Sequence, residues 1–124
     1  MGGGDTENDK ETTIWGLKTR VKEFVHAREW EKYHNPKDLA EAICIEAAEL
    51  LQIFQWRTLE ETRTWKSDVK KLGPIKEEIA DILIYCLSLA NALDIDLSEA
   101  ILHKIGRNEE KYPVAKFRGK AHIS

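Results

Sequence analysis

Apolar residues recur at helical spacing along most of the chain, and no stretch alternates apolar and polar positions as a half-buried strand would. The pattern predicts four long helices, at residues 14–30, 36–57, 74–94 and 97–111, and one short helix at residues 59–70. We therefore expect an all-α protein, folded as a compact bundle of four long helices plus one short helix.

Capping residues mark several of the predicted helix starts. Asn35 followed by Pro36 is the pattern of an N-cap residue with proline at the first helical position. Thr58 and Asp96 each precede a glutamate by three residues, which is the spacing of a capping box. We place one further start at Pro74, where a Gly-Pro pair separates a polar stretch from an apolar one.

Length and composition indicate one ordinary domain. The chain has 124 residues, of which 42% are hydrophobic and 33% charged, and a net charge of −3. A core of that size needs no disulfide. We expect a disordered tail at residues 1–11, a helical domain at 12–114 and a C-terminal tail at 115–124.

Charge and hydropathy exclude two classes of partner. Binding to duplex nucleic acid would need a clustered excess of Lys and Arg, which residues 1–100 lack. No window of 18 apolar residues exists and the first residues do not form a secretory signal, so we expect no membrane partner and a cytoplasmic location.

Two glutamates interrupt an otherwise apolar helix. Between Ala42 and Trp56 the only charged residues are Glu46 and Glu49, which helical spacing places on one face. Leu50 lies within about 40° of Glu46 on that face. A carboxylate on an apolar face is costly unless it is protonated, paired with a cation or bound to a metal.

Glu78 and Asp81 form a second pair with the same spacing. Asp81 is the only charged residue between Ile79 and Leu93. If the two pairs face each other, they form an all-oxygen site that suits Mg²⁺, with Mn²⁺ as the alternative ion. Acids near a helix N-terminus are also favoured by the macrodipole and commonly face water, so the second pair taken alone fits a solvated first turn better than a metal site.

These motifs resemble a known family. The segments EAAE at 46–49 and EIAD at 78–81, with FQW at 54–56 and KIGRNEEKYPV at 104–114, are similar to the all-α MazG-like nucleotide pyrophosphohydrolases and closest to their short dCTP pyrophosphatase branch. The resemblance covers about residues 14–114.

The resemblance implies a reaction and the residues that carry it. A nucleoside triphosphate would be cleaved between its α and β phosphates, with Mg²⁺ held by the metal ligands Glu46, Glu49, Glu78 and Asp81. Glu49 and Glu46 would be the catalytic carboxylates, and Glu49 is our choice for the residue that orients or deprotonates the attacking water. Glu77 is a reserve ligand.

Two further sets of residues match positions of the family. Helical spacing places two cations and an amide on one face of the last long helix, where they fit a phosphate clamp or, alternatively, a solvated charged face. These residues are Lys104, Asn108 and Lys111. The resemblance implies that a second set lines a pocket for base and sugar, although a tryptophan at helical spacing is more often part of a core. This set is Trp30, His34, Trp56 and Tyr85.

One position departs from the family pattern. Gln52 stands where some relatives carry a third acid one turn beyond Glu49, which leaves the number of metal ions open. The base is open as well, with dCTP as the first choice.

The apolar faces of the helices indicate the quaternary structure, and the remaining motifs bear on alternative functions. An apolar arc that includes Leu83 and Leu87 adjoins Asp81, so we expect a homo-oligomer, a tetramer first and a dimer second. A di-iron bundle needs Glu-x-x-His motifs on two helices, and it is disfavoured because only the motif of Glu23 and His26 lies on a predicted long helix; that of Glu31 and His34 lies between two of them. A non-catalytic helical module that binds nucleotide or a protein partner is the alternative function.

Overall fold

The structure, a computed structural model, describes residues 7–121 and is built from helices. Its α-helices are α1 (Ile14–Ala27), α2 (Pro36–Phe54), α3 (Leu59–Arg63), α4 (Val69–Ala92), α5 (Leu97–Lys111) and α6 (Val114–Phe117). Two 3₁₀ helices, η2 (Glu31–Tyr33) and η3 (Trp65–Ser67), complete the set. Because no strand occurs in this part of the chain, the all-α prediction is confirmed.

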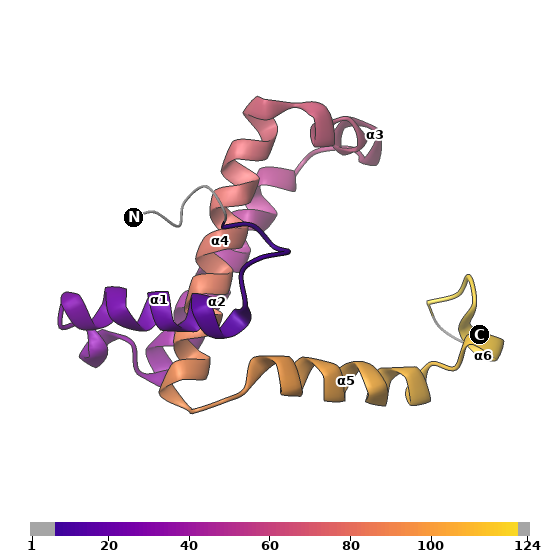
Figure 1. Cartoon of the computed structure of the whole chain (residues 1–124). Coiled ribbons are helices and arrows are strands. Elements are labelled where there is room, and N and C mark those ends of the chain that lie inside the picture. Colours follow the sequence, from indigo (N-terminus) through magenta and orange to yellow (C-terminus); the bar gives the residue numbers. More distant parts are fainter. Residues whose placement is uncertain (1–6, 122–124) are drawn as a thin grey trace. The chain divides into compact units, whose positions relative to one another are not determined.

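The chain forms two compact units. The first ends at Asp94 and contains α1 to α4, and the second begins at Ile95 and contains α5 and α6. Three of the four predicted long helices, α1, α2 and α4, therefore pack in the first unit, where α1 and α2 both contact α4 (Figure 1). The fourth, α5, belongs to the second unit.

The pairing of α2 with α4 is the main contact of the first unit. His34, just before α2, is hydrogen-bonded to Ser88 near the end of α4. Glu46, in the middle of α2, instead lies beside Glu78 in the first half of α4. The two helices are therefore antiparallel, and Leu39 of α2, 1% exposed, is buried in the unit.

Side-chain caps confirm three predicted helix starts. Asn35 Oδ1 accepts a 2.9 Å hydrogen bond from a backbone N–H of the first turn of α2, with Pro36 as the first helical residue. Thr58 and Glu61 form a reciprocal capping box at α3. Asp96 Oδ1 caps α5 through a 2.9 Å bond from a backbone N–H.

The predicted start at Pro74 is wrong. Helix α4 begins at Val69, where Asp68 Oδ1 accepts hydrogen bonds from the backbone N–H groups of Lys70 and Lys71. Pro74 lies inside the helix and costs it one backbone donor near the N-terminal end. The aspartate cap opens the helix five residues earlier, so the predicted short helix at residues 59–70 is divided among α3, η3 and the first turn of α4.

Three helices are followed by a residue with a positive φ angle, which the residue types in the sequence do not indicate. Glu29, Trp56 and Asp94 have φ angles of 52°, 67° and 54° and lie two residues beyond the last residues of α1, α2 and α4. This left-handed position after a helix usually holds glycine. Because none of the three is glycine, the predicted ends at residues 30, 57 and 94 lie two or three residues too far along the chain.

Parts of the two predicted tails, residues 1–6 and 122–124, lie outside the described residues. Near the start, Asn8 C=O accepts hydrogen bonds from the N–H groups of Glu11 and Thr12, and Glu7 pairs with Arg20 of α1 at 2.6 Å. At the other end, the predicted tail contains most of α6. None of the helices in the described part is long and apolar enough to cross a membrane.

We expect Glu29→Gly to stabilise the protein by about 0.5–1 kcal/mol, because glycine adopts a positive φ without a steric penalty. Glu23→Gly is the matched control, since Glu23 is exposed inside α1. There the same substitution should destabilise by about 1 kcal/mol. Urea unfolding measures both changes, and a loss of stability in Glu29→Gly would contradict the assignment of strain.

Candidate functional site

Helices α2 and α4 bring acidic side chains together across their contact. Carboxylate oxygens of Glu46, Glu49 and Glu78 lie within 4.8 Å of one another. We call these three residues the carboxylate cluster. Within residues 7–121 they are the one group of three or more Asp, Glu, His or Cys residues with the spacing of metal ligands. Three of the four predicted ligands therefore meet.

Two oxygens of the carboxylate cluster are buried without a partner. Glu46 Oε2 and Glu78 Oε2 are shielded from solvent and have no hydrogen-bond donor in the described part of the chain. A buried acceptor left in this state is costly and rare. None of the ion pairs formed within residues 7–121 involves the carboxylate cluster. The donor set, all oxygen and anionic, fits a hard divalent cation.

Mutual repulsion raises the pKa values of two members of the carboxylate cluster, Glu46 and Glu49. The pKa of Glu46 is raised, first because its carboxyl lies within hydrogen-bonding distance of that of Glu78, and then because it is partly shielded from solvent. The pKa of Glu49 is raised mainly by its contact with Glu46. The negative charge of Asp81 contributes to both shifts, so it acts on the cluster from α4. Like charges held this close favour protonation or a bound cation.

The two remaining acids of α4 differ in their position. Asp81 is exposed and lies outside the 4.8 Å group, but it lines a cavity of about 560 Å³ between α1 and α4. Glu77 is exposed and is absent from both the group and the cavity, so the structure does not bring the reserve ligand into the site.

A cavity of about 560 Å³, which we call the aromatic cavity, lies between α1 and α4. It is lined by Leu17, Arg20, Val21, Phe24, Val25, Trp30, His34, Asp81, Ile84, Tyr85 and Leu87. The rings of His34 and Tyr85 are 6.1 Å apart, and Trp30 packs edge-on against Phe24. Three of the four predicted base-pocket residues thus meet in one cavity, with a carboxylate at its edge. A cavity lined in this way can hold a flat ring. If the same molecule carries an anionic group, a cation can link that group to the carboxylates.

Trp56 does not join the other aromatic residues. Its side chain is 90% exposed, it follows the C-terminal end of α2 and it does not line the aromatic cavity. Its predicted role in a base pocket stays a prediction.

Arg20, the cation of the aromatic cavity, is not among the site residues predicted from the sequence. Arg20 lies three residues after Leu17 and four before Phe24, so it shares their face of α1. Its guanidinium pairs with Glu7 at 2.6 Å, and both side chains are largely exposed. A cation at this place can pair with an anionic part of a bound molecule, and the spacing of Arg20 from apolar neighbours was the available signal.

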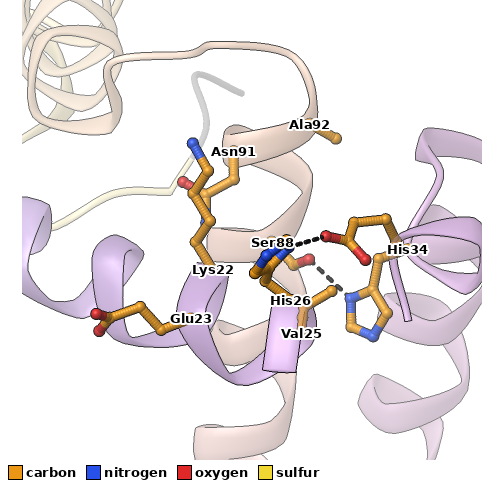
Figure 2. Close-up of a pocket in the computed structure, with 9 residues that line it drawn as sticks. Lys22, Glu23, Val25, His26, His34, Ser88, Asn91 and Ala92 are labelled. Atoms are coloured by element: carbon orange, nitrogen blue, oxygen red, sulfur yellow. Dashed lines mark hydrogen bonds and ion pairs between the residues drawn. The ribbon is translucent and has the colours of Figure 1, made fainter. Parts of the chain in front are cut away.

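Ser88 is the second residue that the sequence analysis did not single out as a site residue. Its hydroxyl lies 2.8 Å from His34 Nδ1, inside a second cavity of about 530 Å³ (Figure 2). His34 lines both cavities, so its ring forms part of the wall between them. Partial burial lowers the pKa of His34, which favours the neutral imidazole.

The predicted phosphate clamp lies on α5. Lys104, Asn108 and Lys111 occupy one exposed face of this helix, as their spacing predicts. Lys111 Nζ lies 5.4 Å from the ring of Tyr112. These residues belong to the second unit, and their approach to the carboxylates stays a prediction.

The fold and the site define an all-α protein whose two antiparallel helices present a candidate metal site of carboxylates. The profile of the MazG-like family matches residues 42–122. The chain belongs to the MazG-like family.

Similar proteins agree with this assignment. The chain is 36% identical to dCTP pyrophosphatase 1 of Bos taurus over 111 residues, which cover 90% of this chain and 66% of the relative. It is 34% identical to dCTP pyrophosphatase 1 of Homo sapiens over 103 residues, which cover 83% of this chain and 61% of the relative. The chain thus spans less than two thirds of the length of these curated relatives.

A solved structure shows the same fold. The crystal structure of a pyrophosphatase from Archaeoglobus fulgidus superposes with a TM-score of 0.72 at 45% sequence identity. The match covers 81% of this chain and 92% of the other.

We expect the contribution of Glu46 and Glu49 to the stability of the metal-free protein to fall as the pH rises from 4.5, the ordinary pKa of a glutamate. The folded state keeps protons on Glu46 and Glu49 that the unfolded state has released, so the free energy of unfolding falls through their raised pKa values. Glu46→Gln should therefore stabilise the chelator-treated protein at neutral pH and reduce the stabilisation that a divalent cation gives.

Urea unfolding with chelator and with Mg²⁺ or Mn²⁺ measures both effects. Glu60→Gln is the matched control, because the side chain of Glu60 is 80% exposed on α3. Equal stabilisation of wild type and Glu46→Gln by the cation would contradict a metal site at the carboxylate cluster.

Proposed function

We propose that this protein is a Mg²⁺-dependent nucleoside triphosphate pyrophosphohydrolase. It would convert dCTP, or a related nucleoside triphosphate, into the nucleoside monophosphate and pyrophosphate. The observation that carries the proposal is a cluster of carboxylates with unpaired buried oxygens beside an aromatic cavity. The names of the relatives, dCTP pyrophosphatase 1, support the reaction and the choice of base.

The acids would act at the triphosphate end of the substrate. Glu46, Glu49, Glu78 and Asp81 would hold Mg²⁺, with Mn²⁺ as the alternative. The bound ion would neutralise phosphate charge and lower the pKa of water. Glu49 is exposed, so its carboxylate can reach the water that attacks the α-phosphorus and take its proton. The new bond joins the water oxygen to the α-phosphorus, and the bond from that phosphorus to the bridging oxygen breaks, so pyrophosphate leaves.

The rest of the site would bind the substrate. Trp30, His34 and Tyr85 line the aromatic cavity and would hold the base and sugar, with ring faces that suit stacking. Arg20 supplies the cavity with a positive charge. The phosphate-binding roles of Lys104, Asn108 and Lys111, and the base contact of Trp56, rest on the family resemblance.

We propose a homotetramer as the working form, with a homodimer as the second choice. Large apolar side chains on both paired helices remain exposed in the single chain, Leu51 to 67% and Leu83 to 54%. Exposed apolar surface of this kind is typical of protein interfaces. Sedimentation equilibrium distinguishes the two assemblies from a monomer.

Pyrophosphate release from a panel of ribo- and deoxyribonucleoside triphosphates with Mg²⁺ tests the proposed reaction. We expect dCTP to be the preferred substrate. Glu46→Gln and Glu49→Gln should each lower kcat/KM by about 100-fold or more, because losing a metal ligand removes several kcal/mol of transition-state stabilisation.

Glu60→Gln again serves as the matched control and should keep wild-type kinetics. Hydrolysis of a triphosphate that carries another base would support the proposed reaction and refute dCTP as the preferred substrate. If no triphosphate is turned over while nucleotide still raises the melting temperature, the protein is a nucleotide-binding module instead.

We expect Trp30→Ala to raise KM for dCTP about 5- to 100-fold with a smaller change in kcat, because stacking on an aromatic side chain contributes about 1–3 kcal/mol per base. Trp15→Ala is the control, since Trp15 is 75% exposed and lies outside the aromatic cavity. Steady-state kinetics decide the matter. Unchanged KM in Trp30→Ala would show that the base binds elsewhere.

A further inference from the structure

The wall between the two cavities contains a partly buried hydrogen bond to the imidazole of His34. Ser88 Oγ lies 2.8 Å from His34 Nδ1, and the ring's other nitrogen lies on the edge away from Ser88 (Figure 2). Ser88 is 5% exposed, whereas His34 also borders the aromatic cavity beside Tyr85. The bond joins residues 54 positions apart, so it exists only because α4 passes the start of α2.

The direction of this hydrogen bond follows from what surrounds the hydroxyl. Within residues 7–121, His34 is the hydrogen-bond partner of Ser88 Oγ. If Nδ1–H donated to Ser88, the hydroxyl proton would have no acceptor among these residues. Donation by Ser88 O–H to Nδ1 is the arrangement in which this contact satisfies both groups. A neutral imidazole that accepts at Nδ1 carries its proton on Nε2.

We propose that Ser88 is a positioning residue, which fixes His34 as the Nε2–H tautomer and so presents an N–H donor to the base in the aromatic cavity. The second half of this statement rests on the proposed function. A donor at that wall suits the acceptor atoms of a pyrimidine, its O2 carbonyl or an unprotonated N3. It opposes a base edge that offers only N–H donors, because two donors would face each other.

The tautomer itself can be measured without any substrate. Long-range ¹H–¹⁵N correlation spectra of the ¹⁵N-labelled full chain distinguish the two neutral imidazole tautomers, and His34→Gln identifies the signal. We expect His34 to be a single Nε2–H tautomer at neutral pH. An Nδ1–H tautomer, or a mixture of the two in wild type, would overturn the proposal.

Variants of Ser88 test its effect on the site. Ser88→Ala should give His34 a mixture of tautomers and raise KM for dCTP about 3- to 10-fold, the range expected for one hydrogen bond, with kcat changed less than about 2-fold. Ser88→Thr retains a hydroxyl and should restore both the spectrum and KM. Ser98→Ala is the matched control, because Ser98 is exposed on α5.

The outcomes separate this proposal from the proposed function. If wild type hydrolyses no triphosphate, the proposed function fails, while the spectra still decide the role of Ser88. If Ser88→Ala leaves the tautomer or KM unchanged, or lowers kcat as much as it raises KM, Ser88 does not position His34 for the base. If Ser88→Ala does not fold, the wild-type tautomer and Ser88→Thr remain decisive.

Discussion

The antiparallel packing of α2 against α4 is the constraint on which the site depends. It brings glutamates from both helices within 4.8 Å of one another and buries two of their oxygens without donors. This arrangement opposes folding, since like charges repel and buried acceptors prefer partners. The apolar contacts around Leu39 and Leu87 must outweigh that cost. A divalent cation would turn the same repulsion into binding energy, because three carboxylates are already held within 4.8 Å of one another.

The same helix pairing gives the first unit its two chemically different regions. Near the middle of α2 the contact carries carboxylates, and toward the beginning of α2 it carries the rings of His34 and Tyr85. Asp81 borders both regions because it acts on the cluster and also lines the aromatic cavity. A molecule with a polyanionic end and a flat ring fits this division. The Ser88–His34 bond extends the pairing, since it sets the ring on the wall of the aromatic cavity.

The sequence predicted those parts of the structure that depend on local pattern. Glu46 and Glu49 were recognisable because no other residue between Ala42 and Trp56 is charged, and the caps at Asn35 and Thr58 were recognisable from residue type and spacing. Pro74 misled because the aspartate cap at residue 68 starts the helix before the proline.

Features that depend on tertiary contacts could not be predicted from the pattern. The partnership of Ser88 with His34 spans 54 positions, and the place of Arg20 in the aromatic cavity requires α1 to pack on α4. The role of Trp56 was assigned by resemblance; the residue has a φ of 67° just beyond the end of α2 and is 90% exposed, and its role stays a prediction. The most direct test of the account is ³¹P NMR of the products that the full chain forms from dCTP and Mg²⁺ in ¹⁸O-labelled water. We expect dCMP that carries the label, together with unlabelled pyrophosphate. Formation of dCDP and phosphate, or label in the pyrophosphate, would contradict it.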